Sequence, residues 1–118
     1  MIMKIDAIVR EEKFEDVKNA LMEIEVNGLT VSQVMGCGLQ RGYKEIVRGM
    51  EVEPQMQPKV KFEIVVSSEE WEKKTIDAIQ KAAYTGEMGD GKIFSYEIRS
   101  ALKIRTKETG YDAIQVTE

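Results

Sequence analysis

Four segments of this chain alternate apolar and polar residues with a period of two, and two segments carry apolar residues at helical spacing. In the third of the period-two segments, Val60, Phe62, Ile64 and Val66 alternate strictly with other residues. The expected strands are residues 2–10, 29–35, 60–66 and 92–98, and the expected helices are 12–25 and 68–84. Their order along the chain is strand, helix, strand, strand, helix, strand. Few topologies satisfy this order with short, right-handed connections.

The two helices can cover one face of a single four-stranded sheet. Asn27-Gly28 is a stop signal for the first helix, and Ser67 with Glu70 has the spacing of a capping box ahead of the second. No repeat or Pro/Gly-rich linker divides the 118 residues. We therefore predict one domain, 1–118, with the α+β ferredoxin-like βαββαβ sandwich fold.

Composition excludes several classes of site. The chain has no histidine, so it can form neither a Ser-His-Asp triad nor a His-ligated zinc site. Its single cysteine, Cys37, cannot make an intrachain disulfide, and we expect it to be a small packed side chain rather than a nucleophile. The net charge of −4 argues against nucleic acid and direct lipid insertion, and the charged N-terminus argues against a signal peptide. A cytoplasmic location is the resulting prediction.

Residues 36–58 interrupt the pattern with four glycines, two prolines and no sustained period. Connections of about 20 residues are usually functional in so compact a domain. At its start, the glycines of the run 36–40 allow close approach of a ligand, and Gln40 offers an amide oxygen to a metal. The loop carries many apolar groups beside arginines and acids. It either packs on the body or binds a partner, and we favour the partner.

Two features could hold a polyphosphate. The run from Gly89 to Lys92 can direct backbone N–H groups into one concavity beside a lysine, although taken alone it is more often a plain tight turn. Lys103 and Arg105 would share one face of an extended segment within 102–106, as a phosphate clamp or as an ordinary charged strand edge.

Together, four motifs resemble the PII nitrogen-signalling family along nearly the whole chain. Residues 85–94, TGEMGDGKIF, are similar to the family's B-loop, assigned here to about 85–92. The other matches are Ile104-Arg105-Thr106 in the C-loop region (about 102–118), Pro58-Lys59-Val60-Lys61, and Arg48-Gly49 in the T-loop (about 37–57). The Gly-Cys-Gly-Leu-Gln sequence at 36–40 resembles Gram-positive members associated with ammonium transporters.

This resemblance implies a homotrimer with ATP or ADP in the clefts between subunits. The nucleotide-binding residues that it implies are Thr30, Gly38, Leu39, Gln40, Glu63, Val65, Gly89, Asp90, Gly91, Lys92, Lys103 and Arg105. It also implies that Gln40 completes a Mg²⁺ site between the phosphates and 2-oxoglutarate, and that Lys59 pairs with the distal carboxylate of that oxoacid. The implied partner-binding residues of the T-loop are Tyr43, Arg48, Gly49, Met50 and Val52.

Several positions depart from the family pattern. Val52 and Met50 stand where other members carry a uridylylated tyrosine or a phosphorylated serine, so we expect switching by ligands alone. Leu39 and Lys103 replace arginines near the phosphates, which would change nucleotide affinity or preference.

The expected function is a non-enzymatic sensor of ATP/ADP and 2-oxoglutarate. Its T-loop would dock on an ammonium transporter and recruit the protein reversibly to the membrane. Slow incidental ATP hydrolysis is compatible with this role. The alternatives are control of a soluble enzyme or transcription factor, a PII-like protein for another small ligand, and a small hydrolase that uses Asp, Glu or Lys.

Overall fold

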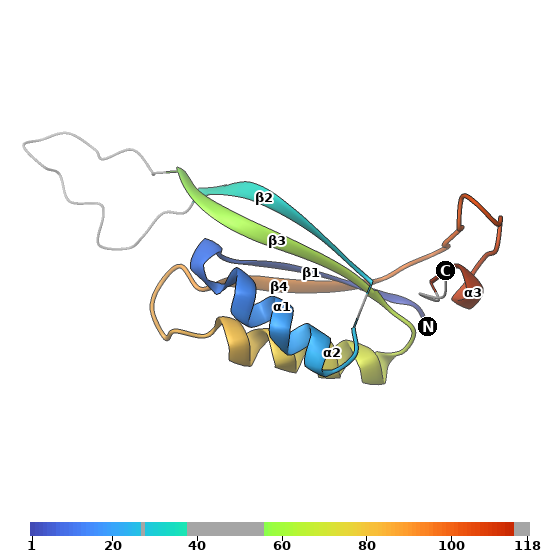
Figure 1. Cartoon of the computed structure of the whole chain (residues 1–118), viewed down its shortest axis with the longest axis horizontal. Coiled ribbons are helices and arrows are strands. Elements are labelled where there is room, and N and C mark those ends of the chain that lie inside the picture. Colours follow the sequence, from blue (N-terminus) through green and yellow to red (C-terminus); the bar gives the residue numbers. More distant parts are fainter. Residues whose placement is uncertain (27, 38–55, 115–118) are drawn as a thin grey trace, which may run out of the picture.

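The computed structural model describes residues 1–26, 28–37 and 56–114. In this part of the chain the elements follow the predicted order, with a short 3₁₀ turn before the first helix and a short helix near the C-terminus (Figure 1). The elements are β1 Met3–Arg10, η1 Glu11–Lys13, α1 Phe14–Glu23, β2 Leu29–Cys37, β3 Met56–Val66, α2 Glu69–Ala83, β4 Gly91–Glu97 and α3 Tyr111–Ile114.

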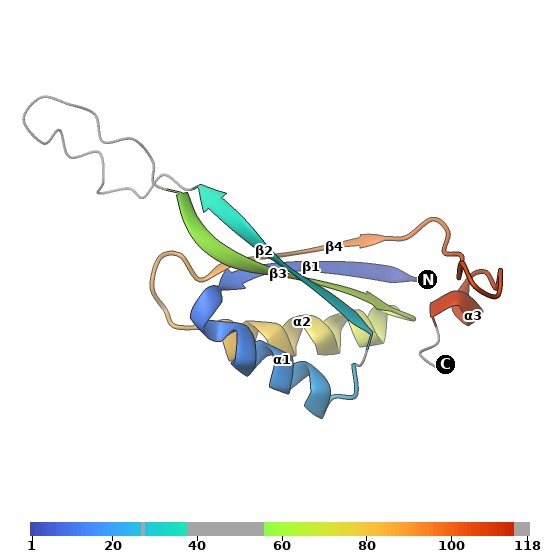
Figure 2. The same ribbon diagram turned by 45° about the horizontal axis from the view of Figure 1, so that its top comes forward.

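The four strands form one antiparallel sheet with the order β2-β3-β1-β4. Figures 1 and 2 show α1 and α2 side by side on one face of this sheet, while no helix of the described residues covers the other face. This two-layer arrangement confirms the predicted α+β ferredoxin-like fold. No helix in the described part of the chain combines the length and the apolar character needed to cross a membrane.

The hydrophobic core lies between the sheet and the two helices. Residues of β1 alternate between buried and partly exposed along its whole length, and those of β3 do so from Val60 onward, as period-two patterning requires. The largest fully buried side chains are Phe62, Ile5, Leu21, Ile64, Ile79, Val9, Val17 and Thr75. The opposite face of the sheet therefore presents the other residues of each strand, including the charged ones discussed below.

The end of α1 and the start of α2 both differ from the sequence prediction. Helix α1 ends at Glu23, before Asn27-Gly28, because Glu25 adopts a φ of +65°. The amides of Glu25 and Val26 then donate to the carbonyls of Met22 (3.0 Å) and Leu21 (2.9 Å), which forms a Schellman-type cap. A glutamate thus takes the place usually held by glycine.

Helix α2 begins one residue later than the predicted capping box. Ser68, rather than Ser67, is the N-cap, and its Oγ accepts a hydrogen bond from the Trp71 amide at 3.2 Å. Glu70 therefore does not occupy the position at which a capping box needs its glutamate. Of the predicted core stripe, Ile79 and Ala83 are buried, whereas Ile76 is partly buried and packs against the core.

The segment 102–106 is a turn and not the predicted extended piece. Leu102 forms an isolated antiparallel bridge with Thr109, and the Lys103 amide donates to the Glu108 carbonyl at 2.8 Å. Residues 104–106 form the turn between these two contacts. Lys103 and Arg105 therefore do not lie on a strand whose alternation would place both side chains on one face, so the predicted arrangement is wrong.

Candidate functional site

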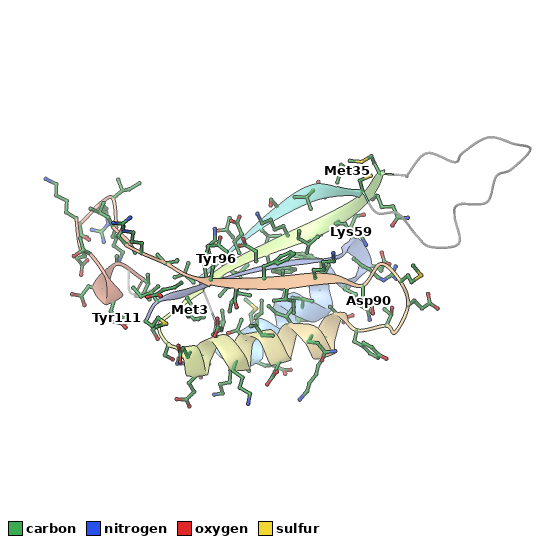
Figure 3. All side chains as sticks on the ribbon, turned by 180° about the vertical axis from the view of Figure 1, so that it is seen from behind. Met3, Met35, Lys59, Asp90, Tyr96 and Tyr111 are labelled. Carbon is green, nitrogen blue, oxygen red and sulfur yellow. The ribbon has the colours of Figure 1, made fainter. Side chains whose placement is uncertain are left out.

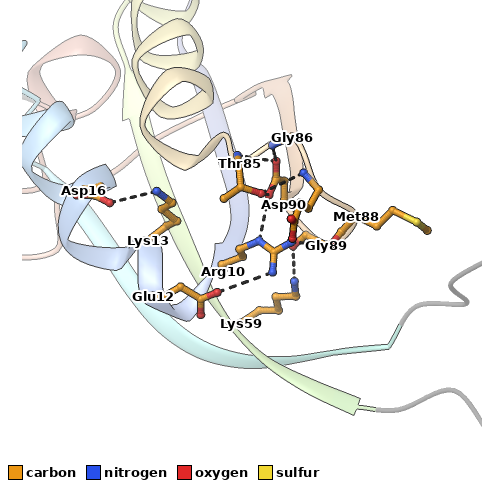
Figure 4. Close-up of polar contacts among 11 residues, drawn as sticks. Arg10, Glu12, Lys13, Asp16, Lys59, Thr85, Gly86, Met88, Gly89 and Asp90 are labelled. Atoms are coloured by element: carbon orange, nitrogen blue, oxygen red, sulfur yellow. Dashed lines mark hydrogen bonds and ion pairs between the residues drawn. The ribbon is translucent and has the colours of Figure 1, made fainter.

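The loop between α2 and β4 (residues 84–90, here the α2–β4 loop) is organised by the carboxylate of Asp90. This carboxylate accepts hydrogen bonds from the amides of Thr85 (2.9 Å) and Gly86 (3.0 Å) and from the Thr85 hydroxyl (Figure 4). These donors, the Thr85 hydroxyl first, hold the pKa of Asp90 well below its ordinary value, although partial burial opposes them. The side chain of Asp90, predicted to be a nucleotide ligand, thus serves to fold the loop.

Two cations from neighbouring strands reach the same loop. Arg10 ends β1 and is the register partner of Lys59 on β3. The Nε of Arg10 lies 3.0 Å from Asp90 Oδ1 and its Nη2 donates to the Met88 carbonyl at 2.6 Å, while Lys59 Nζ donates to the Gly89 carbonyl at 2.5 Å (Figure 4). Lys59 was a predicted site residue, whereas sequence reasoning missed Arg10. Its role depends on a contact 80 positions away, for which no local pattern gives a signal.

Glycine is required where the α2–β4 loop enters β4. Gly91 has a φ of +103°, and a Cβ built there would lie 1.8 Å from the carbonyl oxygen of Ile8. Gly89 has a φ of +101°, and its Cβ would lie 3.2 Å from Arg10 Nη2. Lys92 follows as the register partner of Ile8, so it lies on the same sheet face as Arg10 and Lys59. This end of the sheet therefore combines a tight glycine turn with three cations, a pattern suited to an anion.

Three residues that the resemblance placed at the adenine lie together elsewhere on the chain. Thr30 and Glu63 are register partners of β2 and β3, and with Val65 they line a groove of about 600 Å³. Lys4 also lines this groove and binds Glu63 through Nζ and Oε1 at 2.8 Å. That hydrogen bond lowers the pKa of Glu63 and raises the pKa of Lys4. The groove is open and mixed in polarity.

Within one chain, the two predicted phosphate-binding groups lie at opposite ends of the sheet. The α2–β4 loop precedes β4 and residues 102–106 follow it, so the seven residues of β4 lie between them (Figure 1). A strand of this length spans about 20 Å. In Figure 3, Asp90, Lys59 and Met35 lie towards one end of the molecule and Tyr111 lies at the other. The structure therefore does not bring Lys103 and Arg105 to the α2–β4 loop of the same chain.

The predicted site residues of the long loop between β2 and β3 lie outside the described residues. These are Gly38, Leu39, Gln40, Tyr43, Arg48, Gly49, Met50 and Val52. The strands on either side are longer than predicted: β2 runs to Cys37, which pairs with Met56 at the start of β3. Cys37 is exposed, so the prediction that it is a packed side chain is wrong. A Cβ on Gly36 would lie 3.1 Å from Lys59 Cγ, so this glycine leaves room for the Lys59 side chain. The residues described contain no cluster of three or more Cys, Asp or Glu able to hold a metal.

Comparison with known proteins gives concordant matches over almost the whole chain. Residues 2–108 match the family model described as nitrogen regulatory protein P-II. The nitrogen regulatory protein P-II 1 of Methanothermobacter thermautotrophicus is 50% identical over 111 residues, which cover 94% of this chain and 96% of that protein. The solved structure of B. subtilis GlnK is 39% identical with a TM-score of 0.78, over 95% of this chain and 97% of that one. The B. subtilis GlnK-ATP complex is 37% identical with a TM-score of 0.77, over 95% and 96% of the two chains.

Proposed function

The chain belongs to the nitrogen regulatory protein P-II family, and from this premise we propose that it senses ATP or ADP together with 2-oxoglutarate and reports their levels through its T-loop. Proteins of this family are named nitrogen regulatory proteins. Signal transduction is thus the general function, and the ligands and partner below are the proposal. We assign no catalytic step to the chain.

The observation that carries the proposal is the basic glycine turn at the α2–β4 loop. Its backbone is fixed by Asp90, Arg10 and Lys59, and Lys92 stands beside it on the same face of the sheet. Fixed backbone N–H groups and nearby cations bind phosphate without chemical change. The similar B. subtilis GlnK was solved in complex with ATP, which supports a nucleotide as the anion.

One nucleotide would be shared between two subunits of a trimer. The α2–β4 loop would hold the phosphates from one subunit, and Thr30, Glu63 and Val65 would hold the adenine from its neighbour, with Lys103 and Arg105 also from that neighbour. The α2–β4 loop is separated from Lys103 and Arg105 of the same chain by the whole of β4, which supports this division. The sheet face without helices carries Phe94 and Tyr96, which are 52% and 45% exposed, and Ile104 is 91% exposed. Apolar surface of this kind is expected where subunits meet.

2-Oxoglutarate would bind beside the phosphates, at the base of the T-loop. Lys59 would pair with its distal carboxylate, and it already lies at this end of the sheet. Mg²⁺ prefers oxygen ligands, so the amide oxygen of Gln40 would contribute one ligand while the nucleotide and the oxoacid contribute others. The ion would supply positive charge between two anions, and Gly36 keeps the space that Lys59 needs.

Nucleotide binding is testable by titration calorimetry of the purified chain with ATP and with ADP. We expect saturable binding that weakens in Lys92→Gln, because this substitution removes a cation beside the phosphates. Lys18→Gln is the matched control, since Lys18 lies on α1, where it pairs with Glu15 and stands over the Phe14 ring. Absence of binding at millimolar ATP and ADP would refute the proposal.

The partner would be an ammonium transporter, bound through Tyr43, Arg48, Gly49, Met50 and Val52. Regulation of a soluble enzyme or transcription factor is the second candidate. We would incubate the tagged chain with ADP and separate membrane and cytosolic fractions. Capture of a transporter by the unmodified chain and its loss in Arg48→Ala support the first candidate. Capture of a soluble regulator, with none from the membrane, would contradict it.

A further inference from the structure

We propose that Arg10 is the positioning residue of the phosphate-binding turn: it sets the orientation of the peptide groups at residues 88–90 without touching the nucleotide itself. This inference rests on the proposed nucleotide function and adds to it a residue outside the motifs that suggested that function. Arg10 belongs to β1, whereas those motifs lie in the α2–β4 loop, β3, the T-loop and the C-loop region.

The guanidinium of Arg10 is committed to nearby protein atoms. Its Nε binds the Asp90 carboxylate at 3.0 Å, its Nη2 binds the Met88 carbonyl at 2.6 Å, and its Nη1 lies 3.8 Å from a carboxylate oxygen of Glu12. The side chain is only 20% exposed. These contacts engage Nε and Nη2 in hydrogen bonds and place Nη1 at ion-pair distance from Glu12, so we assign Arg10 to the loop and not to direct phosphate binding.

Arg10 in turn needs the acceptors of the α2–β4 loop, because it lies beside another cation. Arg10 and Lys59 are directly opposite each other on β1 and β3, and like charges in this relation repel. Three acceptors compensate for them, namely the Asp90 carboxylate and the carbonyls of Met88 and Gly89. The conformation of the turn and the pairing of these two cations therefore stabilise each other.

The contacts determine where the amides of the turn point. A trans peptide group is planar, and its C=O and N–H point in opposite directions. With the Met88 carbonyl held by Arg10 and the Gly89 carbonyl held by Lys59, the N–H groups of Gly89 and Asp90 point away from the two cations. Successive amides fixed in this way form an anion-binding surface. Gly89 also fits closely over the guanidinium, since its Cβ would lie 3.2 Å from Nη2.

Arg10 should matter more to the turn than Lys59 does. Lys59 makes one contact to a neutral carbonyl, whereas Arg10 binds both a carbonyl and the carboxylate that folds the loop. Hydrogen bonds between charged groups are the stronger kind. For ATP in the absence of 2-oxoglutarate, we therefore expect a larger loss of affinity in Arg10→Gln than in Lys59→Gln.

The test is ATP titration of the full chain and of five variants, Lys59→Gln and the four named below, with thermal unfolding of each. We expect Arg10→Gln and Asp90→Asn to weaken ATP binding about tenfold, the effect of losing one charged hydrogen bond. Arg10→Lys should recover part of the affinity, because it keeps the charge but not the fork. Lys18→Gln is the control and should bind like the unmodified chain. Hydrogen exchange should quicken at the Thr85 and Gly86 amides in Arg10→Gln, since both donate to Asp90.

The outcomes separate this inference from the proposed function. If the unmodified chain binds no ATP, the nucleotide function is refuted and the role of Arg10 falls with it. If the unmodified chain binds ATP and Arg10→Gln binds it equally well, only the role of Arg10 is refuted. Should Arg10→Gln fail to fold, Arg10→Lys decides the question, because it keeps the charge and removes the fork that binds Asp90 and Met88 together; ATP binding equal to that of the unmodified chain would then refute the role of Arg10.

Discussion

Replacing Gly91 by alanine should destabilise the fold far more than the same replacement at Gly110. Both glycines have positive φ, +103° at Gly91 and +62° at Gly110. A Cβ at Gly110 meets no atom within 4 Å, whereas at Gly91 it would lie 1.8 Å from the oxygen and 2.9 Å from the carbon of the Ile8 carbonyl. These are backbone atoms of β1, so no side-chain rotation can relieve the contact.

The magnitudes follow from these geometries. Gly110→Ala bears only the conformational cost of a left-handed alanine, about 1 kcal/mol. Gly91→Ala bears a similar conformational cost. The start of β4 must also move more than 1 Å away from β1, because non-bonded heavy atoms stay about 3 Å or more apart. The move breaks the pairing of Gly91 with Val9, and each lost backbone hydrogen bond adds about 1 kcal/mol. We expect a total of about 3 kcal/mol.

Urea unfolding followed by circular dichroism would measure both variants. The protein concentration must be equal in all samples, because the stability of an oligomer depends on it. A loss at least 2 kcal/mol greater in Gly91→Ala than in Gly110→Ala is the expected result, estimated from the left-handed and ladder costs above. Equal stability of the two variants would refute the reasoning that Gly91 is needed for the close approach of β4 to β1.

Three further predictions concern the hydrophobic core, the N-cap of α2 and the effect of low pH on the α2–β4 loop. Ile79→Ala removes a fully buried side chain and should cost about 3 kcal/mol in the same unfolding assay, and a loss below about 1 kcal/mol would contradict the packing. Ser68→Ala should cost about 1 kcal/mol of unfolding free energy, and Ser67→Ala should be close to neutral. A larger loss in Ser67→Ala than in Ser68→Ala would contradict the observed cap and favour the predicted capping box. Because folding lowers the pKa of Asp90 from 3.8, protection of the Thr85 amide should be complete above pH 3.8 and disappear only as the pH falls further, through the lowered pKa. Loss of that protection between pH 5 and pH 4 would contradict this assignment.

The spacing of the apolar residues predicts the strands and helices well, because that spacing depends only on which face of each element is buried. The alternation of Ile5, Ala7 and Val9, and of Phe62 and Ile64, predicted two strands that are buried on one face, and these two strands pair in the sheet. The ends of elements depend on single conformations instead. Nothing in the sequence singles out Glu25 as a left-handed residue, so the end of α1 was predicted too late.

The candidate site was predictable where a motif is contiguous and not where it is built by the fold. The glycines of residues 89–92 were visible as a turn, and the family resemblance supplied Lys59, Thr30 and Glu63. Arg10 was missed because a charged residue at the end of a strand is ordinary. Its role becomes visible only in the structure, where Arg10 lies opposite Lys59 in the sheet and binds the Asp90 carboxylate. The turn at 102–106 was likewise hidden, since Leu102 bridges to Thr109 outside the apparent strand.

The proposed sensor depends above all on two ligands that bind together at one end of the sheet. The most direct test is titration of 2-oxoglutarate into the chain in three states: alone, with ATP, and with ATP and Mg²⁺. We expect binding of the oxoacid only in the third state, and its loss in Lys59→Gln while ATP binding is largely kept. Equal binding of 2-oxoglutarate in all three states, or none in any of them, would contradict a sensor that combines the two signals.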